Sequence, residues 1–335
     1  MTPFDDNPPP QDTPQESGTA APELQPAARS FGYSPQSVSG DPFSMASASI
    51  GQSPADAAYF RIPGLPEDLR ISWSWPHLLL SIGFFFVSQL VVGVVLFGYY
   101  SMDHHLTQSQ IKKLVESPKF LVATTVIWSA VMILFLYITL SVLRDLPFWR
   151  SLGWKKFGSQ ATTGKGRPWM YFLAGCGLSI FVAAAGSRMK DVDHTPIQEM
   201  FKSPSSAMLL MAMAVLVAPL FEETLFRGYL YPVLTRIISS SAQSLGIEPQ
   251  AALRFGVGCS IALTGGLFGL THAPQLGWTL GLVAMLVLVG VVLTSVRAWT
   301  GTVVASFFLH LGYNSMIALS TIIATKGFTH MPTLK

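Results

Sequence analysis

Two adjacent glutamates and an arginine near the end of a long apolar run are the first candidates for chemistry. The run starts at about Ala207 and continues into Glu222, Glu223 and Arg227. Ionisable groups at membrane depth are costly, so by default they mark a functional site. In a helix, Glu223 and Arg227 share a face and can pair, whereas Glu222 points about 100° away from Glu223. Glu222 is then free for chemistry, unless all three residues form a structural ion cluster or sit in water at a helix end.

Three further polar residues interrupt apolar runs. Phe268 and His272 end one run four residues apart, and His310 and Asn314 have the same spacing within the last run. Residues four apart lie on one helical face. A lone histidine in a span is usually a packing residue or a polar contact between helices. Buried polar groups need partners, however, so we expect Glu222, His272, His310 and Asn314 to share one site.

A glutamate, two histidines and an asparagine suit hydrolysis without a covalent intermediate. A carboxylate and a neutral imidazole can deprotonate and hold a water. An imidazole and a carboxamide can donate to the oxyanion that forms when this water attacks a carbonyl. Alternatively, Glu222, His272 and His310 make a His2Glu set that can hold Zn²⁺, which would then activate the water. These residues alone do not decide between the two mechanisms.

Other membrane-protease mechanisms do not fit the sequence. There is no HExxH motif of a zinc protease. The sequence also lacks a serine and histidine pair in a GxSG context and a pair of membrane aspartates. The candidate residues therefore stand outside those three patterns.

The composition indicates a polytopic membrane protein. Half of the 335 residues are hydrophobic and 12% are charged, against about 25% in soluble domains. The apolar residues gather in separate long runs, which predicts an all-α bundle of transmembrane helices. A net charge of +3 gives no sign of nucleic-acid binding. Cys176 and Cys259 lie in apolar runs without a CxxC spacing, so we interpret them as small buried hydrophobes.

About seven runs approach the roughly 20 residues that a crossing helix needs. They are His77–Tyr99, Phe120–Leu143, Trp169–Gly186, Ala207–Tyr229, Phe255–Thr271, Trp278–Val296 and Thr302–Ala324. Polar residues at span ends or in loops are expected to be solvated: His77, His104, His105, Asp191, Asp193, His194 and His330. For Glu222 and His272 to meet, the fourth helix must continue through Tyr231–Ile238. The fifth must stop at His272–Pro274.

Three short patterns resemble the signatures of one protein family. The patterns Glu222–Arg227, Phe268–His272 and His310–Asn314 are similar to the EExxxR, FxxxH and HxxxN/D signatures of the CPBP family, in the family's order. This family comprises CAAX prenyl endopeptidases, Abi-type proteins and bacteriocin-processing or immunity proteins. The resemblance covers only the C-terminal part of the chain.

The resemblance implies an intramembrane endopeptidase acting on a membrane-embedded or lipidated peptide. The best-known activity in the family removes the last three residues after a prenylated cysteine. The resemblance also implies roles: Glu222 and His272 activate the water, and His310 and Asn314 stabilise the oxyanion. The supporting residues would be Glu223, Arg227 and Phe268. The family is often labelled a metalloprotease, but this mechanism requires no metal, so we favour the metal-free version and keep Zn²⁺ as the alternative.

The chain is expected to divide into four parts. Residues 1–70 are rich in Pro, Ser and Gln and predict a disordered tail. Residues 71–200 hold N-terminal transmembrane helices and the basic, aromatic connector Arg144–Lys156, which we expect to lie in headgroups. Residues 201–325 form the catalytic core, and residues 326–335 a C-terminal tail. The distribution of Lys and Arg favours a cytoplasmic N-terminus in a bacterial inner membrane.

Two other classes of function remain open from the sequence. The first is a non-catalytic immunity or scaffold protein that keeps the polar cluster. The second is a transporter that uses the intramembrane Glu and His as an ion or proton relay. Retention of the complete set of polar residues favours the enzyme, and the lack of an evident internal repeat argues against the transporter.

Overall fold

The computed structural model describes residues 65–102, 107–158, 165–189 and 203–330. Within these ranges the chain is helical and contains no strand. The chain divides into a unit of residues 1–51 and one of residues 52–335, and every described residue belongs to the second. Most of the predicted tail, residues 1–64, lies outside the described residues. The same holds for His104, His105, Asp191, Asp193, His194 and residues 331–335.

Seven described helical segments are long and apolar enough to cross a membrane, which confirms the predicted all-α polytopic bundle. They are α3 (Trp75–Ser101), α5 with its π-helical end η2 (Pro118–Val142), α7 (Pro168–Gly186), α9 to α11 (Pro204–Ser244), α12 (Pro249–Thr271), α13 (Leu280–Thr300) and α14 (Val303–Ala324). Four shorter elements complete the described part: η1 (Glu67–Leu69), α4 (Gln108–Val115), α6 (Phe148–Ser151) and η5 (Ala273–Leu276).

Prolines mark where five of the spans begin. They occupy the first or second helical position of α3, α5, α7, α9 and α12. A proline lacks an N–H and has a helix-compatible φ, so the first turn is where a helix tolerates it best. Hydropathy does not detect these polar starts. The fifth span was therefore predicted from Phe255, whereas α12 begins at Pro249 after the capping residue Glu248.

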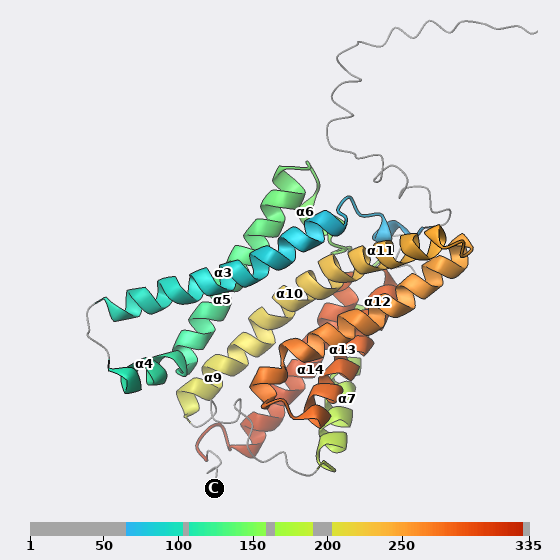
Figure 1. Cartoon of the computed structure of the whole chain (residues 1–335). Helices are drawn as coiled ribbons and strands as arrows, with labels where there is room; N and C mark the ends of the chain where they lie inside the picture. Colours follow the sequence, from blue (N-terminus) through green and yellow to red (C-terminus); the bar gives the residue numbers. More distant parts are fainter. Residues whose placement is uncertain (1–64, 103–106, 159–164, 190–202, 331–335) are drawn as a thin grey trace, which may run out of the picture. The chain divides into compact units, whose positions relative to one another are not determined.

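The fourth span is one uninterrupted helix from Pro204 to Ser244 (Figure 1). It consists of α9 (Pro204–Ala212), η3 (Met213–Val217), α10 (Ala218–Glu222), η4 (Glu223–Leu230) and α11 (Tyr231–Ser244). The predicted continuation through Tyr231–Ile238 is confirmed. Both η3 and η4 are π-helical, and each ends two residues before an interior proline, Pro219 or Pro232. A proline ring clashes with the carbonyl four residues earlier, and a wider π turn relieves that clash.

The hairpin of α11 and α12 places Glu222 and His272 at the same depth. In Figure 1, α12 runs back alongside α11. Glu222 lies 22 residues before Ser244, and His272 lies 23 residues after Pro249. The two arms therefore return to nearly the same level. As predicted, α12 stops at Thr271, and His272 is its C-cap residue.

Glycines allow the helices of the C-terminal core to approach closely. A Cβ on Gly269 would lie 2.4 Å from Cγ2 of Val287 on α13. A Cβ on Gly312 of α14 would lie 2.0 Å from the carbonyl oxygen of Phe172 on α7. Small residues at such contacts are typical of helix packing in membranes. These contacts pack α13 against α12 and α14 against α7.

The folded part begins before the predicted boundary at residue 70. Leu69, Ile71 and Trp73 are buried. Asp68 Oδ2 accepts a hydrogen bond of 2.7 Å from the fully buried Arg297 of α13. Two main-chain carbonyls of this segment also accept bonds from Arg236 of α11. Residues 65–74 are therefore part of the helical unit, because their buried contacts are long-range and could not be seen in the composition.

The connector Arg144–Lys156 packs into the protein more than its composition indicated. Leu152 is fully buried, and the indole Nε1 of Trp154 donates to Thr224 Oγ1 at 3.2 Å. Trp149 and Arg150 are exposed and remain available to headgroups. The second half of the connector therefore contacts the helix that carries Glu222, and its anchoring in headgroups stays a prediction.

Candidate active site

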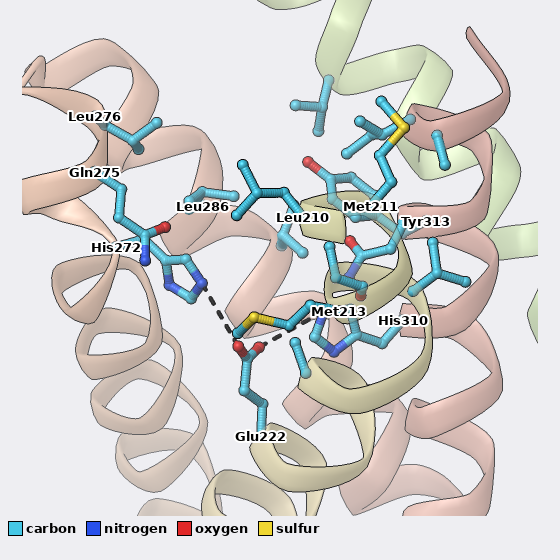
Figure 2. A pocket seen from close by; sticks show the side chains of 18 of the residues that line it. Leu210, Met211, Met213, Glu222, His272, Gln275, Leu276, Leu286, His310 and Tyr313 are labelled. Atoms are coloured by element: carbon cyan, nitrogen blue, oxygen red, sulfur yellow. Dashed lines mark hydrogen bonds and ion pairs between the residues drawn. The ribbon is translucent and has the colours of Figure 1, made fainter. Parts of the chain in front are cut away.

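Glu222 is the last residue of α10 and points into a cavity between two imidazole rings (Figure 2). Its Oε1 lies 3.8 Å from His272 Nε2, and its Oε2 lies 3.8 Å from His310 Nε2. The Glu222 side chain is 18% exposed. A separation of 3.8 Å is too long for a direct hydrogen bond and suits a bridging water.

Glu223 has the opposite environment from its neighbour. Glu223 and Arg227 are both fully buried, and Arg227 Nη1 donates to Glu223 Oε1 at 2.9 Å. Arg227 Nη2 also donates to the Gly290 carbonyl of α13 at 3.0 Å. The guanidinium lies 4.5 Å from the ring centroid of Phe268. The pair expected from helical spacing is thus a buried junction between the fourth span, α12 and α13.

His310 joins the two glutamates. Its Nδ1 lies 2.9 Å from Glu223 Oε1 and its Nε2 faces Glu222. A carboxylate can only accept a hydrogen bond, so Nδ1 must carry a proton. Nε2 then holds a lone pair in the neutral ring and a proton in the imidazolium.

His272 is held by the last turn of its own helix. Its Nδ1 lies 2.8 Å from the carbonyl oxygen of Phe268, which can only accept. The proton of the neutral ring is therefore on Nδ1, and the lone pair of Nε2 faces Glu222. The Phe268 ring lies 4.9 Å from His272 and 5.8 Å from His310, between centroids. Phe268 thus separates and orients both imidazoles, in addition to contacting Arg227.

Asn314 lines the same cavity and is half-buried. Its Nδ2 donates to the carbonyl oxygen of Ala214 in η3 at 2.8 Å. The Ala218 amide bonds to Met213 in the wider π register, so the Ala214 carbonyl would need an amide hydrogen from position 219. That position is Pro219, which has none. Asn314 therefore satisfies a carbonyl that the proline leaves unpaired, and its second amide hydrogen remains available.

The cavity in front of Glu222 has a volume of about 520 Å³ and is mostly apolar. Aliphatic and methionine side chains from five spans surround it, including Leu210, Met211, Leu286 and Val289. Figure 2 shows the Glu222 carboxylate between His272 and His310. An apolar cavity with few convergent polar groups is the usual form of a binding site.

Metal binding by the predicted His2Glu set stays a prediction. Within the described ranges, no group of three or more His, Cys, Asp and Glu side chains is arranged to hold a metal ion. The Nδ1 atom of His310 is engaged by Glu223, and each Nε2 atom is 3.8 Å from the Glu222 carboxylate. Cys176 and Cys259 are free thiols and are half-buried, whereas the sequence predicted fully buried side chains.

His77 is buried, so the prediction that it is solvated is wrong. Its Nδ1 lies 2.7 Å from the hydroxyl of Tyr229, which follows Arg227 by two residues in η4. Ser81 Oγ lies 2.9 Å from the same hydroxyl, and the Trp73 and Tyr229 rings are stacked. A position near a span end does not reveal such a partner from another helix. His330, by contrast, is exposed as expected.

Two cavity residues were missed by the sequence reasoning. Gln275 of η5 lies next to His272, and the Met213 side chain lies beside the Glu222 carboxylate (Figure 2). Gln275 could have been predicted from the sequence, because it is a polar residue directly after the predicted end of the helix at His272–Pro274. Met213 had none, since a methionine in an apolar run is an ordinary packing residue.

The comparison with protein families found one match that includes these residues. Residues 204–316 match the family model described as type II CAAX prenyl endopeptidase Rce1-like. The match covers only the C-terminal part of the chain, which is similar to the CAAX protease family. No curated protein and no solved structure matches the chain in the corresponding comparisons. The matched range contains the CAAX protease signatures expected from the sequence, from Glu222 to Asn314, and begins with the span that holds both π segments.

Proposed function

We propose that the chain is an intramembrane endopeptidase of the CAAX type that hydrolyses a peptide bond in a membrane-embedded or lipidated substrate. One observation carries this proposal: the Glu222 carboxylate lies between the Nε2 atoms of His272 and His310, 3.8 Å from each, at the polar end of an apolar cavity. The match to a family of membrane proteases supports the same reaction.

In this mechanism Glu222 and His272 hold the attacking water. The water donates one hydrogen to the carboxylate and one to Nε2 of the neutral His272 ring. Glu222 takes a proton as the water oxygen bonds to the carbonyl carbon of the substrate. The hydrogen bond from His272 to the Phe268 carbonyl supports this role, because it fixes the tautomer that can accept.

His310 and Asn314 stabilise the oxyanion that this attack creates. His310 donates from Nε2 when its ring is protonated, while Glu223 accepts from its Nδ1. Asn314 donates with the amide hydrogen that Ala214 does not use. The carbon–nitrogen bond then breaks, and Glu222 passes its proton to the leaving amine. No step in this mechanism requires a metal.

The substrate class follows from the shape and polarity of the cavity. About 520 Å³ of mostly apolar space would accommodate a lipid chain or the apolar side chains of a membrane peptide. Nothing in this proposal involves nucleic acid. We place the protein in the bacterial inner membrane with a cytoplasmic N-terminus. A reporter fused to the N-terminus that signals from the periplasmic side would overturn the orientation.

The scaffold and transporter alternatives explain fewer features of the site than hydrolysis does. A scaffold needs the buried Glu223–Arg227 junction but has no need of Glu222 facing a cavity between two imidazoles. An ion relay would need a polar path across the bilayer, whereas the cavity is mostly apolar. Hydrolysis gives a role to each of the four candidate residues, which are Glu222, His272, His310 and Asn314.

The test compares the membrane peptides of cells with the wild-type protein and cells with Glu222→Gln. The amide keeps the shape of the side chain but cannot act as a base, so uncleaved substrates should accumulate only in the variant. Glu248→Gln, at an exposed capping residue of α12, is the matched control and should leave the peptides unchanged. Thermal unfolding in detergent checks that both variants fold. Identical peptide profiles from wild type and Glu222→Gln would refute the proposal.

A further inference from the structure

A second, smaller pocket also reaches Glu222 and His272. Its volume is about 220 Å³, and it shares Met213 and Gln275 with the larger cavity. It differs in its walls, because it includes residues of α3 and none of α13 or α14. The candidate catalytic pair therefore stands where two compartments of different composition meet.

The walls that belong only to the smaller pocket carry several uncharged polar groups. They come from Gln89 of α3, Thr124 and Ser129 of α5, and Thr271 at the end of α12. Gln89 lies near the middle of α3, 14 residues after Trp75 and 12 before Ser101. A carboxamide at that depth is unfavourable in hydrocarbon unless it is solvated or hydrogen-bonded.

Thr124 gives an independent sign that this pocket is wet. In a membrane helix, a threonine hydroxyl commonly donates to the carbonyl four residues earlier. Thr139 and Thr235 do so here, at 2.8 and 2.9 Å. The Thr124 hydroxyl is shielded from the exterior but has no hydrogen-bond partner among the described residues. A buried hydroxyl without a partner is costly, and water in a polar pocket would remove that cost.

We propose that this smaller pocket, lined by Gln89, Thr124, Ser129 and Thr271, is the compartment from which water reaches Glu222 and His272. This inference rests on the proposed hydrolysis. A substrate that fills the larger cavity would block water from that side, so each turnover needs a second route. A volume of about 220 Å³ holds roughly seven waters at ~30 Å³ each. In this arrangement the larger, apolar cavity receives the substrate, and the smaller, polar pocket supplies the water.

Thiol labelling of the full-length protein in detergent micelles tests this division. Cys176→Ala and Cys259→Ala first remove the two native thiols. Thr124→Cys is compared with Ile127→Cys, and Gln89→Cys with Leu90→Cys. Both control positions are exposed, lie on the same helices at similar depth and line neither pocket. The reagent is water-soluble 2-aminoethyl methanethiosulfonate, which reacts with the thiolate and therefore only where water is present.

We expect at least one pocket thiol to react ten-fold or more faster than its control. If neither outpaces its control by that factor, the pocket is not a water compartment and the inference is refuted. Labelling requires no hydrolysis, so this result is independent of the peptide comparison for Glu222→Gln. A negative labelling result would leave the proposed function standing, and a failed peptide comparison would leave a hydrated pocket without its proposed purpose.

Discussion

Glu222 and Glu223 are adjacent in the chain but have different roles, because they point in different directions from the helix. Glu223 is fully buried and bonded to both Arg227 and His310. Glu222 faces a cavity and lies within water-bridging distance of two imidazoles. The consequence is that Glu223 fixes the position of His310, whereas the carboxylate oxygens of Glu222 remain available to accept a proton.

Replacing Arg227 should damage the fold as well as the site. Arg227→Met leaves the Glu223 carboxylate buried without its guanidinium, and breaking such a pair costs about 3–5 kcal/mol. The measurement is equilibrium unfolding in mixed micelles of mild detergent and SDS. In the double variant Glu223→Gln with Arg227→Met, no unpaired charge remains, so much of the lost stability should return. A single variant as stable as the wild type would show that the buried pair is not needed for folding.

Asn314 has a structural contact and a proposed catalytic contact, and these can be separated. Asn314→Leu should lose activity, and it should lose about 1–3 kcal/mol because the Ala214 carbonyl becomes unpaired. Adding Pro219→Ala supplies an amide hydrogen to that carbonyl from the neighbouring turn. The double variant should therefore regain stability but not activity, measured by SDS unfolding and by the peptides that accumulate in cells. Recovery of activity together with stability would mean that Asn314 acts only on the helix.

At the scale of elements, the apolar runs were sufficient to predict the spans but not their ends or their irregularities. Hydropathy misses capping residues and prolines, so α12 begins at Pro249, six residues before the predicted start. The extension of the fourth helix was predictable because Glu222 and His272 had to meet. Its two π segments were not predicted, although Pro219 and Pro232 were visible signals. The burial of His77 depends on Tyr229, 152 residues away, and no local pattern contains that contact.

The packing of α7 on α14 should be sensitive to one glycine and insensitive to another nearby. A Cβ on Gly175 would lie 1.9 Å from the carbonyl oxygen of Leu309, whereas a Cβ on Gly177 meets no atom within 4 Å. Gly175→Ala should therefore force α7 and α14 apart and lower the melting temperature in detergent. Gly177→Ala should be neutral or stabilising, since alanine favours the helix by roughly 0.5–1 kcal/mol over glycine. Equal melting temperatures for the two variants would contradict this packing.

At the scale of the whole molecule, the short segment before α3 ties distant helices together. Asp68 bonds to Arg297 of α13, and Trp73 stacks on Tyr229 of the fourth span. The exposed Glu67 carboxylate accepts a hydrogen bond from Lys155, which lowers the pKa of Glu67 below its usual 4.5. The stabilising effect of this surface contact is present above that pH and is lost as the pH falls below it.

Truncation measures how much this segment contributes. A chain that starts at residue 75 should melt at a clearly lower temperature than one that starts at residue 65. The longer chain keeps the buried Leu69, Ile71 and Trp73 as well as the partner of Arg297. Burying one large apolar side chain stabilises a protein by about 1.5–3 kcal/mol, so the difference should be easy to detect. Equal melting temperatures would show that the segment lies on the protein without stabilising it.

The length of the fourth helix has a practical consequence. A straight helix of 41 residues is about 60 Å long, roughly twice the thickness of the hydrocarbon layer. Part of it must therefore tilt or stand in water, and the polar serine-rich end of α11 is the part suited to water. The turn at Gly246 is then a natural place to graft an epitope. A tag inserted there would be about 33 Å along the helix from Glu222. An antibody against the tag could therefore detect the protein in cells without blocking the candidate active site.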